Sequence, residues 1–235
     1  MLEVRRYRSE DREGVRQVCV ETAFLGSSIL PQYRDAASFA DMFTAYYTDH
    51  EPESAWVVVD DGRVVGYLLG CLDSHACPDP EWVAFKHIVR RWLWLRPGTA
   101  NFCFRSLFDV VHDLGPTRPP VDYARWPAHA HLDLLPEARK GAIALRLFRL
   151  WLDRARERGA AGIWGVSFLE NEPATLLHRA MGFRAEGKPF LATGMRTDAG
   201  KRMHAQVWVQ NLVSVPSALP VPRVTSGAHT PARSL

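Results

Sequence analysis

The sequence has little of what marks several classes of protein. It holds four cysteines among 235 residues, none in a C-x-x-C pair, and this low density excludes the disulfide scaffold of a small secreted domain. No run approaches the ~18 to 20 apolar residues that a membrane-spanning helix needs. The charged N-terminus also lacks the apolar stretch of a signal peptide. We therefore expect a soluble cytoplasmic protein with free thiols and no membrane partner.

Charge of one sign is also scarce. The chain carries 29 Lys and Arg against 26 Asp and Glu, a formal net charge of +3, and the basic residues are spread along it. This distribution gives no reason to expect nucleic acid as a partner, although it leaves room for a small anionic ligand. With 47% hydrophobic and 23% charged residues, the composition is typical of a globular protein with a sizeable core.

Composition divides the chain into three parts. Residues 1–212 form one predicted domain, and the Pro- and Ser-rich residues 213–235 form a tail that we expect to be disordered. Residues 72–127 interrupt the domain with several prolines and two aromatic-rich helical patterns, at 81–95 and 99–112. We interpret them as a helical insertion. Its aromatic side chains either pack on the domain or form a lid over a substrate.

The remaining patterns alternate between strand and helix. Asp61-Gly62 separates two β-branched runs and predicts a tight hairpin turn. Antiparallel strands first and a β-α-β arrangement later predict a mixed α/β (α+β) sheet. We expect strands at 2–7, 55–60, 63–71, 128–135, 161–169, 183–191 and 203–212, and helices at 11–24, 36–47, 142–159 and 173–181.

The stretch HLDLLPEARKGAIALRLFRL raises the first question of chemistry, because a strand leads through a basic turn into a helix. The free N–H groups and positive dipole end of such a helix suit a phosphate group. Gly141, Ala142 and Ala144 are small enough for a ligand to approach the backbone, and Arg139 and Lys140 add positive charge. Taken alone, the pattern fits a structural turn as well as a phosphate site.

A second block, GVSFLENEPATLLHRAMGF, follows at a suitable distance. Together the two blocks resemble the GNAT superfamily of acetyl-CoA-dependent N-acyltransferases. In that family a strand leads into a turn of pattern R/Q-x-x-G-x-G/A, and a later N-x-x-A-x-x-L-Y-x-x-x-G-F segment flanks the cofactor. The resemblance covers nearly all of residues 2–212. The stretches TAFLG and WPAHAHLDLLPEARKG more closely resemble bacterial members related to the acetyltransferase-like domain of O-GlcNAc hydrolases.

The resemblance implies a GNAT-like fold with a helical insertion and a cofactor, acetyl-CoA or another short acyl-CoA. Two positions depart from the family pattern, because Ala142 and Lys140 each replace a common Gly. The implied cofactor-binding residues are Arg139, Lys140, Gly141, Ala142 and Ala144 around the pyrophosphate, Leu134 and Leu135 beside the pantetheine and thioester, and Asn171 on the pantetheine side.

Three residues are candidates for proton transfer. His178 stands where the family has the Tyr that often protonates the departing thiolate, and an imidazolium can donate a proton near neutral pH. It can equally be a helix histidine without a chemical role. His131 and Asp133 share one face of a strand with His129. We expect Asp133 and His131 to take the proton of the incoming amine, directly or through water, unless this face only contacts the insertion.

The function that these features predict is an N-acetyltransferase, which transfers an acyl group directly to a primary amine of a small molecule; a peptide or protein amine stays open, as does a homodimer. One alternative is a weakly active or inactive acyl-CoA-binding module, favoured by Ala142 and the missing Tyr. Another is a metal-dependent hydrolase using His129, His131 and Asp133. The pattern H-x-H-x-D resembles part of a metallo-hydrolase signature, although Leu134 replaces its last His.

Overall fold

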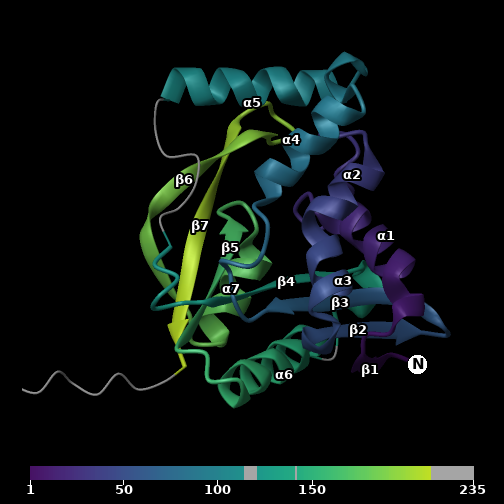
Figure 1. Ribbon diagram of the computed structural model, residues 1–235, viewed down its shortest axis with the longest axis vertical. Helices are drawn as coiled ribbons and strands as arrows, with labels where there is room; N and C mark the ends of the chain where they lie inside the picture. The colour runs from purple at the N-terminus through teal and green to yellow at the C-terminus, as the bar shows by residue number, and fades with distance from the viewer. Residues whose placement is uncertain (114–120, 141, 213–235) are drawn as a thin grey trace, which may run out of the picture.

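The computed structural model describes residues 1–113, 121–140 and 142–212 of the chain. Within them one seven-stranded sheet forms the centre of the molecule (Figure 1). The predicted tail at 213–235 lies outside the described residues and stays a prediction. In spatial order the strands are β1 (Glu3–Arg6), β2 (Ala55–Asp60), β3 (Arg63–Cys71), β4 (Ala128–Leu134), β5 (Gly162–Phe168), β7 (Arg202–Asn211) and β6 (Arg184–Arg196).

The hairpin of β2 and β3 shows how local sequence builds the first half of the sheet. Asp61 and Gly62 have φ angles of 47° and 83°, and two positive φ values give a type I′ turn, whose twist matches that of its flanking strands. The predicted turn is therefore confirmed. From β1 to β4, each strand is antiparallel to its neighbour, whereas β4 and β5 are parallel. The predicted mixed α/β sheet is therefore confirmed.

The sheet opens between β4 and β5. These parallel strands pair only at Ala128 with Ile163 and at His129 with Trp164, although each strand continues beyond that point. Figure 1 shows that β2, β3 and β4 run across the molecule while β5, β6 and β7 run steeply along it. We call the opening between the diverging parts of β4 and β5 the fork.

Helices cover the two faces of the sheet. Tyr67 and Gly70 point to opposite faces of β3. The Tyr67 side lies under the first helices, because its neighbours include Cys19, whereas a Cβ on Gly70 would meet Trp151 at 2.4 Å. The helices of the first face are α1 (Arg12–Thr22), α2 (Ala36–Ala40) and α3 (Tyr46–His50), and the π-helical segment Asp41–Ala45 joins α2 to α3. The other face is covered by α6 (Ile143–Glu157) and α7 (Glu172–Ala180).

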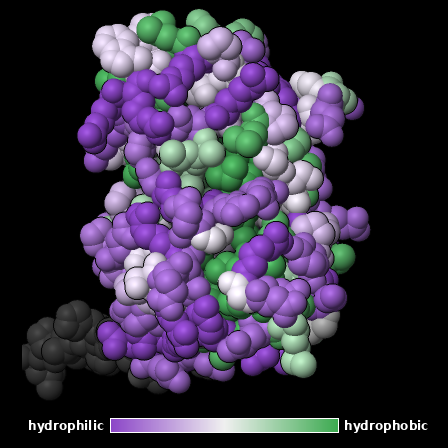
Figure 2. Space-filling model, turned by 90° about the vertical axis from the view of Figure 1, so that its right-hand side faces the viewer, coloured by the Kyte–Doolittle hydropathy of each residue, from purple (hydrophilic) through white to green (hydrophobic). Residues whose placement is uncertain are grey.

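Two helices, α4 (Pro80–Arg90) and α5 (Thr99–Asp113), lie between β3 and β4 in the chain. The sequence predicts that α4 continues to residue 95, but Trp92 adopts a left-handed φ of 53°, which ends the helix. Several large side chains of α4 and α5 are exposed, among them Trp82, Phe85 and Phe104, so most of these aromatics do not pack on the domain as the first interpretation predicts. Figure 2 shows hydrophobic residues at the upper end of the molecule, the end at which Figure 1 places α5.

None of the helices in residues 1–113, 121–140 and 142–212 has both the length and the hydrophobicity that crossing a membrane requires.

Candidate active site at the fork of the sheet

The edge of β4 that faces the fork carries unpaired backbone groups. The Leu135 N–H donates to the Val65 carbonyl of β3 at 2.9 Å. Since the backbone groups of successive residues in a strand point alternately to its two sides, the even-numbered residues of β4 direct theirs towards β5. The pairing of His129 with Trp164 uses the Ala130 N–H, so the amides that face the fork are those of Leu132 and Leu134. The Leu135 amide, predicted to face a cofactor, is used inside the sheet instead. The donors at the fork are therefore the amides of Leu132 and Leu134.

Asp133 and His131 meet at the hydroxyl of Tyr67, as the shared strand face predicts. The Tyr67 O–H donates to Asp133 Oδ2 at 2.6 Å, and its oxygen lies 3.1 Å from His131 Nδ1. Burial raises the pKa of Asp133, and the nearby His131 and the Tyr67 hydrogen bond oppose this rise. Burial therefore makes this carboxylate a stronger proton acceptor than an exposed aspartate.

The hydrogen bonds also assign the protons of His131. The single Tyr67 proton goes to Asp133, so the contact between Tyr67 and His131 requires a proton on Nδ1 of the imidazole. In the neutral ring Nε2 then carries the lone pair, and it lies 3.7 Å from Asp133 Oδ2. The His131 side chain is 30% exposed and that of Asp133 is 16% exposed. His131 is therefore the more accessible base, and Asp133 can stabilise its imidazolium form.

His129 belongs to a different cluster from His131 and Asp133. Its Nε2 lies 2.9 Å from the Tyr47 hydroxyl and its Nδ1 2.7 Å from Ser74 Oγ. Among the described residues, the groups spaced to share a metal ion place His129 with two cysteines and place His131 and Asp133 with another. The expected set of His129, His131 and Asp133 is therefore wrong as a single metal site, because its members face different neighbours.

The turn into α6 offers backbone donors at the other end of β4. Ala142 has φ 57° and ψ 25°, and no side chain caps the helix. The N–H groups of a first helical turn have no partner within the helix, and the helix dipole makes this end positive. Left-handed backbone costs an Ala about 1 kcal/mol, which explains why the family pattern has Gly here. Gly141 lies outside the described residues, so its predicted role stays a prediction.

Arg139 binds protein carbonyls rather than facing open space. Its Nε donates to the Leu134 carbonyl at 2.9 Å, and its Nη2 donates to the Gly26 carbonyl at 2.6 Å. Gly26 has a φ of 85°, and a Cβ there would lie 2.8 Å from Nη2, so a larger residue would displace the guanidinium. The predicted contribution of the Arg139 side chain to phosphate binding is corrected: this residue joins the turn to the segment after α1. Lys140 is exposed.

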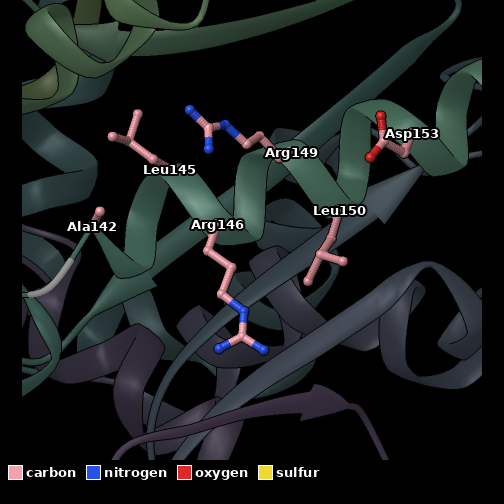
Figure 3. A pocket seen from close by; sticks show the side chains of 6 residues that line it. All are labelled: Ala142, Leu145, Arg146, Arg149, Leu150 and Asp153. Atoms are coloured by element: carbon pink, nitrogen blue, oxygen red, sulfur yellow. The ribbon is translucent and has the colours of Figure 1, made fainter.

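A hollow of about 370 Å³ lies along α6, beginning at Ala142 (Figure 3). Arg149 projects to one side of the helix and Arg146 to the other, and neither has an ion-pair partner among the described residues. These two cations were not among the predicted residues, although the spacing of 142, 146 and 149 places them on neighbouring rows of one helix. The other lining residues are Leu145, Leu150 and Asp153.

The second predicted block forms the end of β5 and the whole of α7. The Asn171 Oδ1 accepts the Ala174 N–H at 3.2 Å, so this oxygen caps α7 and only the amide nitrogen remains for a ligand.

Ala144, the last predicted pyrophosphate contact, lies in the first turn of α6.

His178 is enclosed by aromatic rings on the α7 face. It is 7% exposed, its ring stacks on Trp208 at 5.3 Å, and Phe148 and Phe183 meet it edge-on. Burial lowers its pKa to about 4, and the bond to the Ala174 carbonyl opposes this only in part. The ring is therefore neutral near pH 7, and its Nδ1 proton goes to that carbonyl at 2.8 Å. The prediction that His178 is the acid is wrong, because no proton remains on Nε2.

Known structures share the fold of this chain, although no protein-family model matches it. The crystal structure of SsHAT is 26% identical, over 91% of this chain and 99% of that chain, with a TM-score of 0.61. An N-acetyltransferase from Staphylococcus aureus Mu50 is 14% identical over 91% and 99%, with a TM-score of 0.54. A GNAT superfamily phosphinothricin acetyltransferase from Sinorhizobium meliloti, solved with acetyl-CoA, is 17% identical over 89% and 88%, with a TM-score of 0.54. This chain has the GNAT fold.

The GNAT fold confirms the part of the prediction that concerns architecture. The closer resemblance, to bacterial members related to O-GlcNAc hydrolases, is not tested by these comparisons and stays a prediction. The fork in the sheet and the uncapped start of α6 place free backbone N–H groups along and beyond one edge of β4.

Proposed function

We propose that the chain is an N-acetyltransferase that uses acetyl-CoA, or another short acyl-CoA, and acts on a primary amine. The observation that carries this proposal is the unpaired edge of β4 at the fork, which lies beside the His131 and Asp133 pair. An extended ligand can add to an exposed strand edge through its own amide groups. Acetyltransferases of the same fold that were solved with acetyl-CoA support the choice of cofactor.

The residues at the fork fit the parts of an acyl-CoA. The Leu134 N–H and the Leu132 carbonyl would bond the amides of the pantetheine, because the Leu134 carbonyl already accepts Arg139 Nε. The Asn171 amide nitrogen lies at the end of the neighbouring strand. The N–H groups at the start of α6 would bind the pyrophosphate, and Arg146 and Arg149 would attract the outlying phosphate. Among the described residues of the turn, Ala142 places a methyl group at the start of α6, beside this cradle.

Three steps of the reaction have a candidate group. The bound cofactor would supply an acyl group activated as a thioester. His131 Nε2 would take a proton from the acceptor ammonium, and Asp133 would stabilise the resulting imidazolium, so that the free amine can attack. The Leu132 amide of the β4 edge would donate to the carbonyl oxygen as it gains negative charge. In the last step the C–S bond breaks and the CoA thiolate leaves, taking the remaining surplus proton of the attacking nitrogen, directly or through water.

The acceptor that we propose is a small-molecule amine. His131 is partly covered, because its ring stacks on Phe43 with the ring centroids 5.5 Å apart, and Tyr67 lies beneath it. A recessed base of this kind suits a slender amine better than a folded protein surface.

We also keep the prediction that the chain resembles bacterial GNAT members related to the acetyltransferase-like domain of O-GlcNAc hydrolases.

The test is to measure acetyl-CoA binding by calorimetry and then thiol release with amines, amino sugars and amino acids. The proposal predicts binding together with thiol release that depends on at least one amine. Leu132→Pro removes one fork-facing amide and is expected to weaken binding, whereas Val64→Ala, on the neighbouring strand and away from the fork, serves as a control for loss of packing. Absence of acetyl-CoA binding by the folded wild-type chain would exclude the proposal.

A second candidate function is an acyl-CoA-binding module without turnover. Two observations favour it: the Ala142 methyl at the cradle, and the burial of His178 in place of the family's Tyr. Acetyl-CoA binding without thiol release across the whole panel would support this module and exclude the enzyme.

A further inference from the structure

Cys71, Cys77 and His129 bring three soft ligand atoms to one point beneath α3. The two sulfurs and one ring nitrogen all lie within 4.8 Å of one another. Cys71 ends β3 and stands directly opposite His129 on β4, so the sheet register fixes two of the three. Cys77 comes from the segment that leads to α4, and it is partly exposed, as is His129.

The hydrogen bonds around Ser74 put the lone pair of His129 on Nε2, where the Tyr47 hydroxyl lies 2.9 Å away and a cation could take its place. The Ser74 O–H donates to the Pro127 carbonyl at 2.6 Å, and its oxygen accepts the Trp164 Nε1–H at 2.9 Å. Its one proton is thus committed, so the 2.7 Å contact to His129 Nδ1 requires the imidazole to donate there. Nε2 then carries a lone pair. A histidine held through its second nitrogen in this way is typical of metal ligands.

We propose that Cys71, Cys77 and His129 bind a zinc ion, with Tyr47 closest to the fourth position. Thiolate and imidazole ligands favour zinc. Zn–S bonds of about 2.3 Å and Zn–N bonds of about 2.0 Å put tetrahedral ligand atoms roughly 3.5 Å apart, which small side-chain rotations reach from the present spacing. The Tyr47 oxygen lies 2.9 Å from Nε2.

The charges of the site also suit a divalent cation. Two thiolates balance the charge of Zn²⁺, so the buried cluster would gain little net charge. The nearby Glu51 carboxylate already accepts the Leu72 N–H at 3.0 Å and is not needed as a ligand. Bound zinc would join β3 and β4 to the start of the insertion, beside the residues at which β4 and β5 separate. This site is independent of the proposed acetyl-CoA site.

The test uses the full chain without an affinity tag, in reducing buffer. Zinc is measured by elemental analysis after dialysis, and Co²⁺ is then titrated into the metal-free protein to observe sulfur-to-cobalt charge-transfer absorption. One zinc per chain and a thiolate absorption band are expected. Cys77→Ser should abolish the band, and Ser74→Ala should weaken zinc binding roughly 10- to 100-fold in competition with a chelator.

Two matched controls locate the site. Cys103→Ser should leave the band unchanged, because Cys103 lies in α5. Cys19→Ser should also leave it unchanged; a band that disappears in Cys19→Ser and persists in Cys77→Ser would move the metal to the cluster with His131 and Asp133 and overturn the proposal. A folded, reduced wild-type chain that binds neither zinc nor Co²⁺ would overturn it as well. Circular dichroism establishes that each variant is folded.

Discussion

The buried imidazole of His178 makes a quantitative prediction about stability and pH. The pKa of His178 falls from its ordinary value of 6.5 to about 4 on burial. The unfolded chain therefore binds more protons between these two values, so the free energy of unfolding falls as pH falls from about 6.5 towards about 4. The difference between the two pKa values corresponds to about 3 kcal/mol in total, of which about 2 kcal/mol is lost by pH 5.

The perturbation is His178→Phe, which keeps an aromatic ring beside Trp208 and removes the titrating group. Urea unfolding at pH 8 and pH 5, followed by circular dichroism, gives the loss of stability in each protein. The loss should be smaller in the variant by about 2 kcal/mol. Phe148→Leu changes the same cluster without removing the imidazole, so it should lower stability at both pH values and keep the wild-type difference. Equal pH differences in the wild type and His178→Phe would refute a neutral, buried His178.

The remaining predictions concern the turn, the proposed base and the loop after α1. Ala142→Gly should raise the free energy of unfolding by about 1 kcal/mol and tighten acetyl-CoA binding in calorimetry. The control Ala144→Gly lies inside the helix and should lower the free energy of unfolding by about 1 kcal/mol. Weaker acetyl-CoA binding by Ala142→Gly would contradict the proposal that this turn binds the pyrophosphate. Tyr67→Phe should slow acyl transfer about tenfold at an unchanged affinity for acetyl-CoA, because it releases Asp133; an unchanged rate would remove Tyr67 from the positioning of this pair. Gly26→Ala should lower the free energy of unfolding by about 2 kcal/mol or more, because it combines a strained φ with a clash against the Arg139 guanidinium. The melting temperature should fall accordingly. A wild-type melting temperature would show that the loop adapts to the added methyl group.

Much of the architecture could be predicted because it depends on local patterns. The Asp61-Gly62 pair has the chemistry of its turn, and period two along β4 places His131 and Asp133 on one face. Helix periodicity likewise located α1, α6 and α7. In these cases the residues that decide the structure are neighbours in the chain.

The missed features depend on contacts between distant segments. His178 looked like an acid because its helix position matched a pattern, but its pKa depends on Trp208 and Phe148, which come from other elements. The Arg139 side chain looked free for a phosphate until the Gly26 carbonyl, 113 residues away, was placed beside it. The separation of His129 from His131 likewise follows from the side chains that meet each ring, which a strand pattern does not reveal.

The central claim is that His131, at the fork, removes the proton of an amine that attacks an acyl-CoA. Its most direct test is the rate of amine-dependent thiol release from acetyl-CoA by His131→Ala, measured beside calorimetry of acetyl-CoA binding. His204→Ala, which changes an exposed histidine of β7, is the control. We predict a rate lower by about 100-fold or more in His131→Ala, at the wild-type affinity for acetyl-CoA and with the control unchanged. A wild-type rate in His131→Ala would contradict the account.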